Sequence, residues 1–188
     1  MTATGEPERH TLRLFFALWP SAVERNALAI ATGAAVAQVD GQAIPASNLH
    51  VTLAFLGSVS GETLAQLVEI GGQVTAPRVE LDFERLEFWP RPKVLVAIPS
   101  RIPVEGVGIV DGLWQRIEPL GIEHETRPWH PHLTLVRRVR RAPPEGLRIS
   151  VGPPASPGTP RYGLALVEST THGSGARYKA LAEWPLGG

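Results

Sequence analysis

A four-residue pattern, histidine-x-threonine-leucine, occurs twice in this 188-residue chain and constrains its fold more than any other feature of the sequence. The first copy covers residues 50–53 (HVTL) and the second covers residues 132–135 (HLTL), a separation of a little under half the chain. A repeat at that distance is what an internally duplicated fold gives. We therefore expect two similar lobes, each of which contributes one copy.

Each copy of the repeat is predicted to lie on a β-strand, because the residues around it are mostly apolar, with β-branched and aromatic positions. Side chains at positions i and i+2 of a strand point to the same face, so His50 shares a face with Thr52 and His132 shares one with Thr134. The aliphatic residues of each copy point to the opposite, buried face. If the lobes pack as a pseudo-symmetric pair, two imidazoles and two hydroxyls line a common groove.

The rest of the chain predicts a mixture of strands and a few helices. Helices are expected over residues 21–39, where Ser21 and Glu24 form a capping-box pattern, from about residue 60, and over a stretch that ends at Gly121. Strands are expected at residues 12–18, 48–56, 79–88, 94–98, 132–136, 162–168 and 178–184.

These elements indicate an α+β fold that forms a single domain over residues 1–188. We expect two pseudo-symmetric lobes, each an antiparallel sheet with helices on the outside, around a central groove. The proline-rich stretch over residues 143–160 is predicted to be a loop, because too little chain follows it to build a second core.

Composition excludes several classes of function. Lysine plus arginine and aspartate plus glutamate number 18 each, so any contact with nucleic acid must be local rather than spread over a basic surface. The absence of cysteine excludes disulfides, thiolate chemistry and cysteine-bound zinc. No apolar run reaches the ~18 residues that span a bilayer, and residues 1–10 lack the apolar centre of a signal peptide, so we expect a cytoplasmic protein without a membrane partner.

A pair of histidines on one groove predicts acid–base chemistry at phosphorus. Imidazoles have an unperturbed pKa near ~6.5, so two of them can be held in opposite protonation states at neutral pH, one as base and one as acid. Such a pair suits in-line displacement without a metal, with threonine hydroxyls on the non-bridging oxygens. A zinc ion shared by the two histidines has less support, because two ligands are too few. The alternative is that both are structural strand residues, and the repetition argues against it.

The residues around these motifs carry a resemblance to a known family. They are residues 13–17 (RLFFA), 48–57 (NLHVTLAFLG), 127–135 (RPWHPHLTL) and 177–181 (RYKAL). The chain resembles the bacterial and archaeal RNA 2′,3′-cyclic phosphodiesterases, also called 2′-5′ RNA ligases, of the two-histidine (2H) phosphoesterase superfamily. The resemblance implies hydrolysis of a terminal 2′,3′-cyclic phosphate on RNA to a 2′-phosphomonoester, with no metal and no cofactor. It also implies that His50 is the general acid, or proton donor, and His132 the general base, or proton acceptor.

Further residues near the second motif are candidates for the site. Strict strand alternation from His132 places Arg138 on the catalytic face as a phosphate contact, whereas the family pattern places that arginine at Arg137; we follow the family and keep Arg138 as the alternative. Trp129 is a candidate for stacking on an RNA base. His130 is interpreted as a structural or supporting residue because Pro131 separates it from the strand.

Two other functions stay open at this point. The chain could be a two-histidine phosphodiesterase that acts on a small cyclic nucleotide or a 2′-5′ oligonucleotide, or a catalytically silent protein that binds RNA ends. By microscopic reversibility the acid and base could also join a cyclic phosphate to a 5′-hydroxyl. The expected partner is RNA with a 2′,3′-cyclic phosphate end, and the expected state is a monomer.

Overall fold

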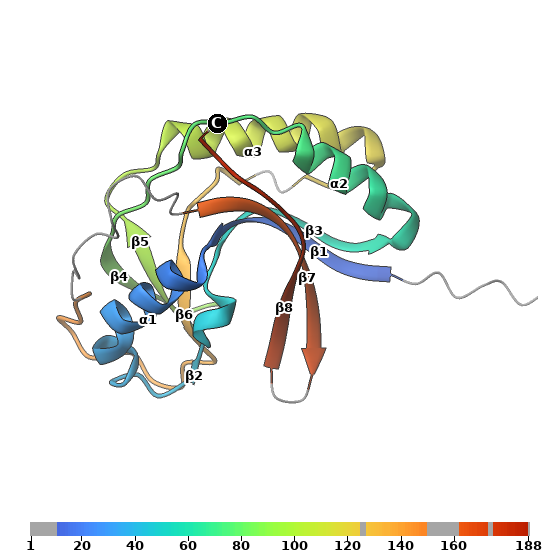
Figure 1. Cartoon of the computed structure of the whole chain (residues 1–188). Coiled ribbons are helices and arrows are strands. Elements are labelled where there is room, and N and C mark those ends of the chain that lie inside the picture. The colour runs from blue at the N-terminus through green and yellow to red at the C-terminus, as the bar shows by residue number, and fades with distance from the viewer. Residues whose placement is uncertain (1–10, 125–126, 150–161, 173–174, 188) are drawn as a thin grey trace, which may run out of the picture.

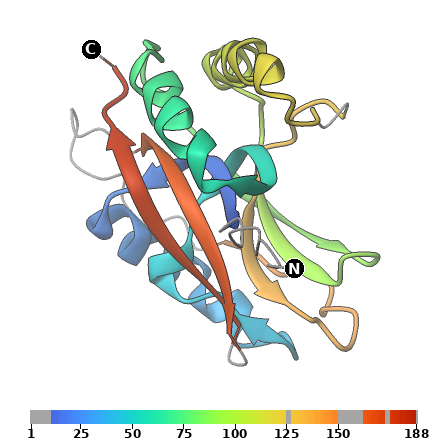
Figure 2. The same cartoon turned by 90° about the vertical axis from the view of Figure 1, so that its right-hand side faces the viewer.

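Two four-stranded antiparallel sheets organise the chain, as the sequence predicts (Figure 1). The computed structural model describes residues 11–124, 127–149, 162–172 and 175–187. The first sheet has the order β3-β1-β7-β8, with bounds Val51–Ser60, Thr11–Pro20, Tyr162–His172 and Gly175–Trp184. The second has the order β2-β6-β5-β4, with bounds Gln42–Ala43, Leu133–Arg137, Val94–Pro99 and Phe83–Trp89. Figure 2 shows the β7–β8 hairpin of the first sheet on one side and strands β4 to β6 of the second on the other.

The helices lie on the outer faces of the sheets. Helix α1 spans Ala22–Val36 and contacts β6, whereas α2 (Leu64–Gly72) contacts β7 and α3 (Val104–Ile117) contacts β3 (Figure 1). Short 3₁₀ turns cover Ala46–Asn48 (η1), Gly61–Thr63 (η2) and Glu118–Leu120 (η3). None of the helices described is long and apolar enough to cross a membrane.

Local sequence signals fix the ends of two helical segments. The hydroxyl of Ser21 accepts a hydrogen bond from the backbone N–H of Glu24 at 3.3 Å, which satisfies one of the free N–H groups at the start of α1. Gly121 ends η3 in the left-handed conformation with φ of 73°, which glycine adopts without a steric cost. The predicted N-cap at Ser21 and the predicted C-cap at Gly121 are confirmed.

Strand β1 is buried on both faces, and each face has a different role. Leu14, Phe16 and Leu18 belong to the main core beneath the helices. Phe15 and Trp19 belong to a small second cluster on the opposite face, which also holds Ala165 and Val167 of β7. That opposite face supports the functional site, so β1 connects the core to the chemistry.

The sequence prediction was wrong at several boundaries. Residues 79–82 were expected in a strand, but β4 begins at Phe83, although Val79 and Leu81 are buried as a strand pattern would require. The strand predicted from residue 48 begins at Val51, because residues 46–48 form the turn η1. The two-residue strand β2 was not predicted at all. Most of the predicted proline-rich loop, from residue 150 onward, lies outside the described residues.

Candidate active site

The two repeated histidines have the same local geometry. His50 stands directly before β3, with its Nδ1 atom 2.7 Å from the backbone oxygen of Asn48. His132 stands directly before β6, with its Nδ1 atom 2.8 Å from the backbone oxygen of His130. A carbonyl oxygen can only accept, so each Nδ1 carries the proton. Each neutral ring therefore leaves its Nε2 atom as the basic nitrogen for chemistry.

Aromatic side chains from the first sheet surround His50. The ring centroids of Phe15 and Tyr178 lie 4.9 Å and 5.0 Å from the centroid of its imidazole, and that of Trp19 lies at 5.8 Å. Burial among these groups lowers the pKa of His50 to about 4, against the opposing effect of the Asn48 carbonyl. The positive charges of Arg137 and His132 lower the pKa further.

His132 lies in a more open position. Its ring centroid is 4.7 Å from that of Trp89, and burial is again the main reason that its pKa is lowered. The His130 carbonyl opposes this shift, while the charges of His130 and Arg137 add to it. The charge of Arg137 lowers the pKa of both histidines, and the charge of His132 lowers the pKa of His50. These three predicted side chains therefore lie within electrostatic reach of one another.

The repeated threonines follow the predicted alternation. Thr52 and Thr134 are half-buried, whereas the leucine that follows each of them is buried. The hydroxyl-bearing residues therefore share the open face with the histidines that precede them.

A β-bulge occurs at the same position of both repeats, directly after the threonine. On β3, Thr52 pairs with Ala17 and Ala54 pairs with the next residue, Phe16, so Leu53 is an extra residue. On β6, Thr134 pairs with Val96 and Val136 pairs with Leu95, so Leu135 is the extra one. Each bulge reverses the parity of the strand beyond it, and the next side chain on the open face is three residues after the threonine rather than two.

This bulge places the two candidate arginines differently. Arg137 lies three residues after Thr134, is half-buried, and places its guanidinium 5.9 Å from the centroid of the Tyr178 ring. Arg138 is exposed and has a positive φ of 52°, which turns the chain out of the strand. Strict alternation fails because of the extra residue at Leu135, and the charge of Arg137 lowers the pKa of both histidines.

Trp129 is held in place by the first motif. Its Nε1 atom donates a hydrogen bond to the backbone oxygen of Thr52 at 2.9 Å. Its ring also packs against Gly106 of α3, where an added Cβ would lie only 2.4 Å from the ring. The indole predicted to stack on a base therefore joins the segment before the second motif to the strand of the first.

His130 is exposed, and its ring lies beside Trp89 with 5.5 Å between the ring centroids. Its carbonyl orients His132, which fits a supporting residue. Trp89 lies beside His132 and was missed by sequence reasoning, because its strand is far in sequence from either motif. Phe15 lies in an apolar run, which favours core packing, and the structure places its ring against that of His50.

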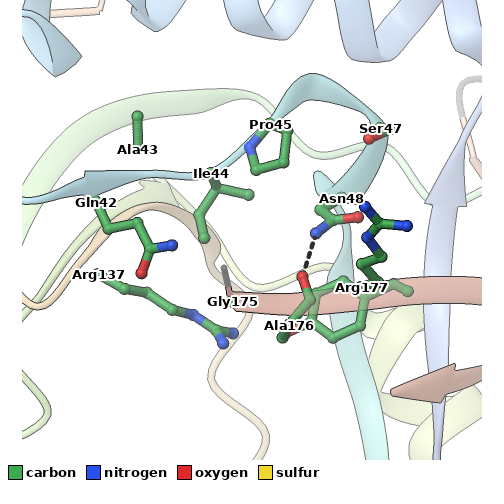
Figure 3. Close-up of a pocket in the computed structure, with 11 residues that line it drawn as sticks. Gln42, Ala43, Ile44, Pro45, Ser47, Asn48, Arg137, Gly175, Ala176 and Arg177 are labelled. Carbon is green, nitrogen blue, oxygen red and sulfur yellow. Dashed lines mark hydrogen bonds between the residues drawn. The ribbon is translucent and has the colours of Figure 1, made fainter. Parts of the chain in front are cut away.

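Two cavities are lined in part by residues of the two motif segments. The polar pocket has a volume of about 340 Å³ and is lined by Gln42, Ser47, Asn48, Arg137, Arg177 and Tyr178, among others (Figure 3). The aromatic pocket has a volume of about 470 Å³, and its lining includes Thr52, Phe55, Trp89, Trp114, Trp129 and His132. Within the described part of the chain, no three histidine, aspartate or glutamate side chains gather closely enough to hold a metal ion.

Comparison with known proteins identifies the family. A family model described as LigT like Phosphoesterase matches residues 18–96. The chain is 31% identical over 152 residues to the RNA 2′,3′-cyclic phosphodiesterase of Escherichia coli K12, with 78% of this chain and 80% of that protein covered. The chain belongs to the LigT-like phosphoesterase family. The RNA 2′,3′-cyclic phosphodiesterase of Thermus thermophilus is also 31% identical, over 94% of this chain and 91% of that protein.

Solved structures agree with this assignment to the LigT-like phosphoesterases. The crystal structure of E. coli LigT complexed with 3′-AMP has a TM-score of 0.75 and 27% sequence identity, covering 94% of this chain and 99% of that one. A crystal structure of a Thermus thermophilus protein has a TM-score of 0.73 and 26% identity, with 94% of this chain covered and 99% of that one. The predicted resemblance and the α+β architecture are confirmed.

Proposed function

We propose that this chain hydrolyses the terminal 2′,3′-cyclic phosphate of RNA to a 2′-phosphomonoester without a metal. The observation that carries the proposal is the matched pair of imidazoles, each with its Nδ1 on a carbonyl two residues earlier. This arrangement leaves the Nε2 atom of each ring available for proton transfer, and the charge of Arg137 lowers the pKa of both rings. One proton acceptor, one proton donor and one fixed cation are what in-line displacement at phosphorus requires.

The proposed reaction assigns one step to each group. The Nε2 of His132 takes a proton from water as the water oxygen attacks phosphorus. The bond from phosphorus to O3′ breaks, and His50 gives its Nε2 proton to O3′, so the phosphate stays on O2′. Arg137 and the hydroxyls of Thr52 and Thr134 stabilise the non-bridging oxygens, where negative charge develops.

The lowered pKa values shape the protonation of the site. In the free protein both imidazoles are mostly neutral at pH 7, because burial lowers both pKa values and that of His50 falls to about 4. A bound cyclic phosphate carries a negative charge, which favours the imidazolium form and raises the pKa of a neighbouring histidine. His50 therefore becomes a competent acid when the substrate binds.

The relatives support a nucleotide substrate. Those from E. coli and T. thermophilus carry the name RNA 2′,3′-cyclic phosphodiesterase, and E. coli LigT was crystallised with 3′-AMP. Both histidines and both pockets come from one chain, so the proposal requires only a monomer.

The test is to incubate the purified protein with an oligoribonucleotide that ends in a 2′,3′-cyclic phosphate, in excess chelator, and to map the phosphate in the product. A 2′-phosphomonoester is expected. A 3′-phosphomonoester, or activity that disappears with chelator, contradicts the proposal. Binding without any product indicates an RNA-end binder, and preference for 2′,3′-cyclic mononucleotides indicates a small-nucleotide enzyme. The variant with both His50→Ala and His132→Ala, purified identically, controls for contaminating nuclease.

A further inference from the structure

We propose that Asn48 is a positioning residue for His50, and that its buried side chain fastens the segment before the first motif to strand β8. The inference rests on the proposed function, since His50 acts there as the proton donor. A positioning residue acts through another group, so Asn48 affects the rate by holding the His50 ring rather than by contact with the substrate.

The side chain of Asn48 is a buried amide. Among the described residues, the buried polar or charged side chains are those of Glu24, Thr32 and Asn48, and only 7% of Asn48 is exposed. A buried amide costs free energy unless it is hydrogen-bonded. The Nδ2 atom of Asn48 donates to the backbone oxygen of Ala176 at 2.9 Å, across 128 positions of the chain (Figure 3). The amide therefore joins the turn η1 to strand β8.

The acceptor of this hydrogen bond lies on an edge strand. β8 is the last strand of the first sheet, where it pairs with β7. An edge strand presents backbone groups without a ladder partner, and other segments or water must satisfy them. The Asn48 side chain satisfies the carbonyl of Ala176. The start of β8 is therefore held against η1 by this side chain.

Two contacts lead from Asn48 to the His50 ring. The backbone oxygen of Asn48 lies 2.7 Å from the Nδ1 atom of His50, and this hydrogen bond sets the tautomer. The second contact runs through β8, where Tyr178 follows Ala176 by two residues. Tyr178 packs edge-on against the His50 ring, with 5.0 Å between the ring centroids. Asn48 thus holds both the carbonyl that orients the ring and the strand that supplies one of its walls.

Asn48 is fixed through its backbone and its side chain together. Its backbone N–H donates to the Pro45 oxygen at 2.8 Å, and the N–H of Leu49 donates to the Ala46 oxygen at 3.1 Å. These bonds belong to the short turn η1, and 3₁₀ hydrogen bonds have poorer geometry than those of an α-helix. The bond to Ala176 adds a long-range tie to this short turn. We therefore expect the direction of the Asn48 carbonyl to depend on the side chain.

The corresponding residue of the second motif is built differently. The backbone oxygen of His130 lies 2.8 Å from the Nδ1 atom of His132, so the carbonyl is common to both motifs. His130 is exposed, however, and its ring lies beside Trp89. The buried amide that joins the carbonyl segment to a distant strand is a feature of the first motif. It therefore serves the ring to which the proposed function assigns the proton donor.

The test compares Asn48→Ala with Asn48→Leu, which removes the same donor but keeps a side chain of similar size. The first readout is NMR of the imidazole nitrogens, which distinguishes a proton on Nδ1 from one on Nε2. In the unaltered protein we expect the His50 proton on Nδ1. In both variants we expect a mixture of the two His50 tautomers, with the His132 ring unchanged. This readout requires no substrate.

The second readout is steady-state hydrolysis of an oligoribonucleotide that ends in a 2′,3′-cyclic phosphate. A displacement of about 1 Å can cost ~10²-fold in rate, so kcat should fall roughly 10- to 100-fold in both Asn48 variants, with KM changing less. Thr32→Val is the matched control, because it also removes a buried side-chain donor to a backbone oxygen, that of Leu28 at 2.8 Å within α1. It should lower the free energy of unfolding and leave the His50 tautomer and kcat unchanged.

The outcomes separate this assignment from the proposed function. An unchanged His50 tautomer in both Asn48 variants, or an equal loss of kcat in Thr32→Val, overturns the positioning role. If neither Asn48 variant folds, exchange of the Asn48 side-chain amide protons with solvent in the unaltered protein decides. Slow exchange supports the tie to Ala176, and fast exchange overturns it. Absence of hydrolysis by the unaltered protein overturns the proposed function instead, and the tautomer readout then still tests the positioning of His50.

Discussion

His50 and His132 share a local structure but stand in different surroundings. Each ring donates its Nδ1 proton to the carbonyl two residues earlier, and a bulge follows three residues later on each strand. Outside the motifs, Phe15 of β1 and Tyr178 of β8 pack against the His50 ring, whereas Trp89 of β4 packs against the His132 ring. Burial lowers the pKa of His50 to about 4. The pKa of His132 is also lowered, although this ring is less buried.

The difference shows which properties a short motif can set. The four repeated residues set the ring tautomer, the face of the threonine and the bulge, because all of these depend on the local backbone. The protonation behaviour depends on side chains from strands distant in the sequence. Duplication of the motif therefore supplies two similar imidazoles, and the surrounding sheets give them different environments.

The largest expected effect comes from removing either imidazole. A positioned acid or base contributes typically ~10²–10⁴ in rate, so His50→Ala and His132→Ala should each lower kcat by that range. The double variant should lose little more than the worse single variant, because one group alone cannot complete the transfer. Single-turnover rates on a cyclic phosphate-ended oligonucleotide measure this. A loss below tenfold in either variant, with folding intact by circular dichroism, contradicts the paired mechanism.

The pH dependence tests the contrast between the two rings directly. The proposed mechanism requires His50 protonated and His132 neutral, and kcat/KM reports the protonation of the free protein. Because the pKa of His50 is about 4, its protonated fraction falls tenfold per pH unit near neutrality. We expect kcat/KM to fall roughly 100-fold from pH 6 to pH 8, and kcat to fall less, since bound phosphate raises the pKa. NMR titration of the His50 ring with and without inorganic phosphate checks the cause, and a flat kcat/KM contradicts it.

The sequence predicted the site residues better than their geometry. The repeat placed His50, Thr52, His132 and Thr134 on their open faces, because strand alternation is a local property. It did not predict the bulges, since an extra residue is visible only in the pairing with β1 and β5. The position of Trp89 beside His132 was missed for a similar reason. An aromatic residue such as Phe15 is typical of a core strand, and only the packing of several strands shows which face it covers.

A comparison of Arg137→Ala with Arg138→Ala tests whether the position that the bulge gives to Arg137 matters for activity. Charge-assisted hydrogen bonds contribute ~1.5–3 kcal/mol, so Arg137→Ala should weaken kcat/KM roughly 10- to 150-fold. Arg138→Ala is the matched control, because it removes the same charge from the exposed neighbour, and it should change kcat/KM less than twofold. Steady-state kinetics of both variants at low and high salt measure the difference. Equal losses in the two variants would mean that the contribution is a diffuse basic charge.

The smallest expected effect concerns Trp129, which connects the two motifs. Trp129→Phe keeps an aromatic face but removes the Nε1 donor to the Thr52 carbonyl. A neutral hydrogen bond contributes ~0.5–1.5 kcal/mol net, so kcat should fall roughly 2- to 12-fold through misplacement of the first motif, with KM unchanged. If Trp129 acts instead by stacking on the substrate base, Trp129→Phe should keep kcat, because phenylalanine can still stack.

Gly106→Ala provides an independent route to the same displacement. A Cβ at that position meets the Trp129 ring at 2.4 Å, so the ring or α3 must move while the indole N–H itself is retained. If the hydrogen bond positions Thr52, this variant should lower kcat in the same direction as Trp129→Phe, and the double variant should lose less than the product of the two single losses. If the losses of kcat in the two single variants multiply in the double variant, the packing of the Trp129 ring and its Nε1 hydrogen bond have separate effects. The hydrogen bond to Thr52 would then not be what connects the two motifs.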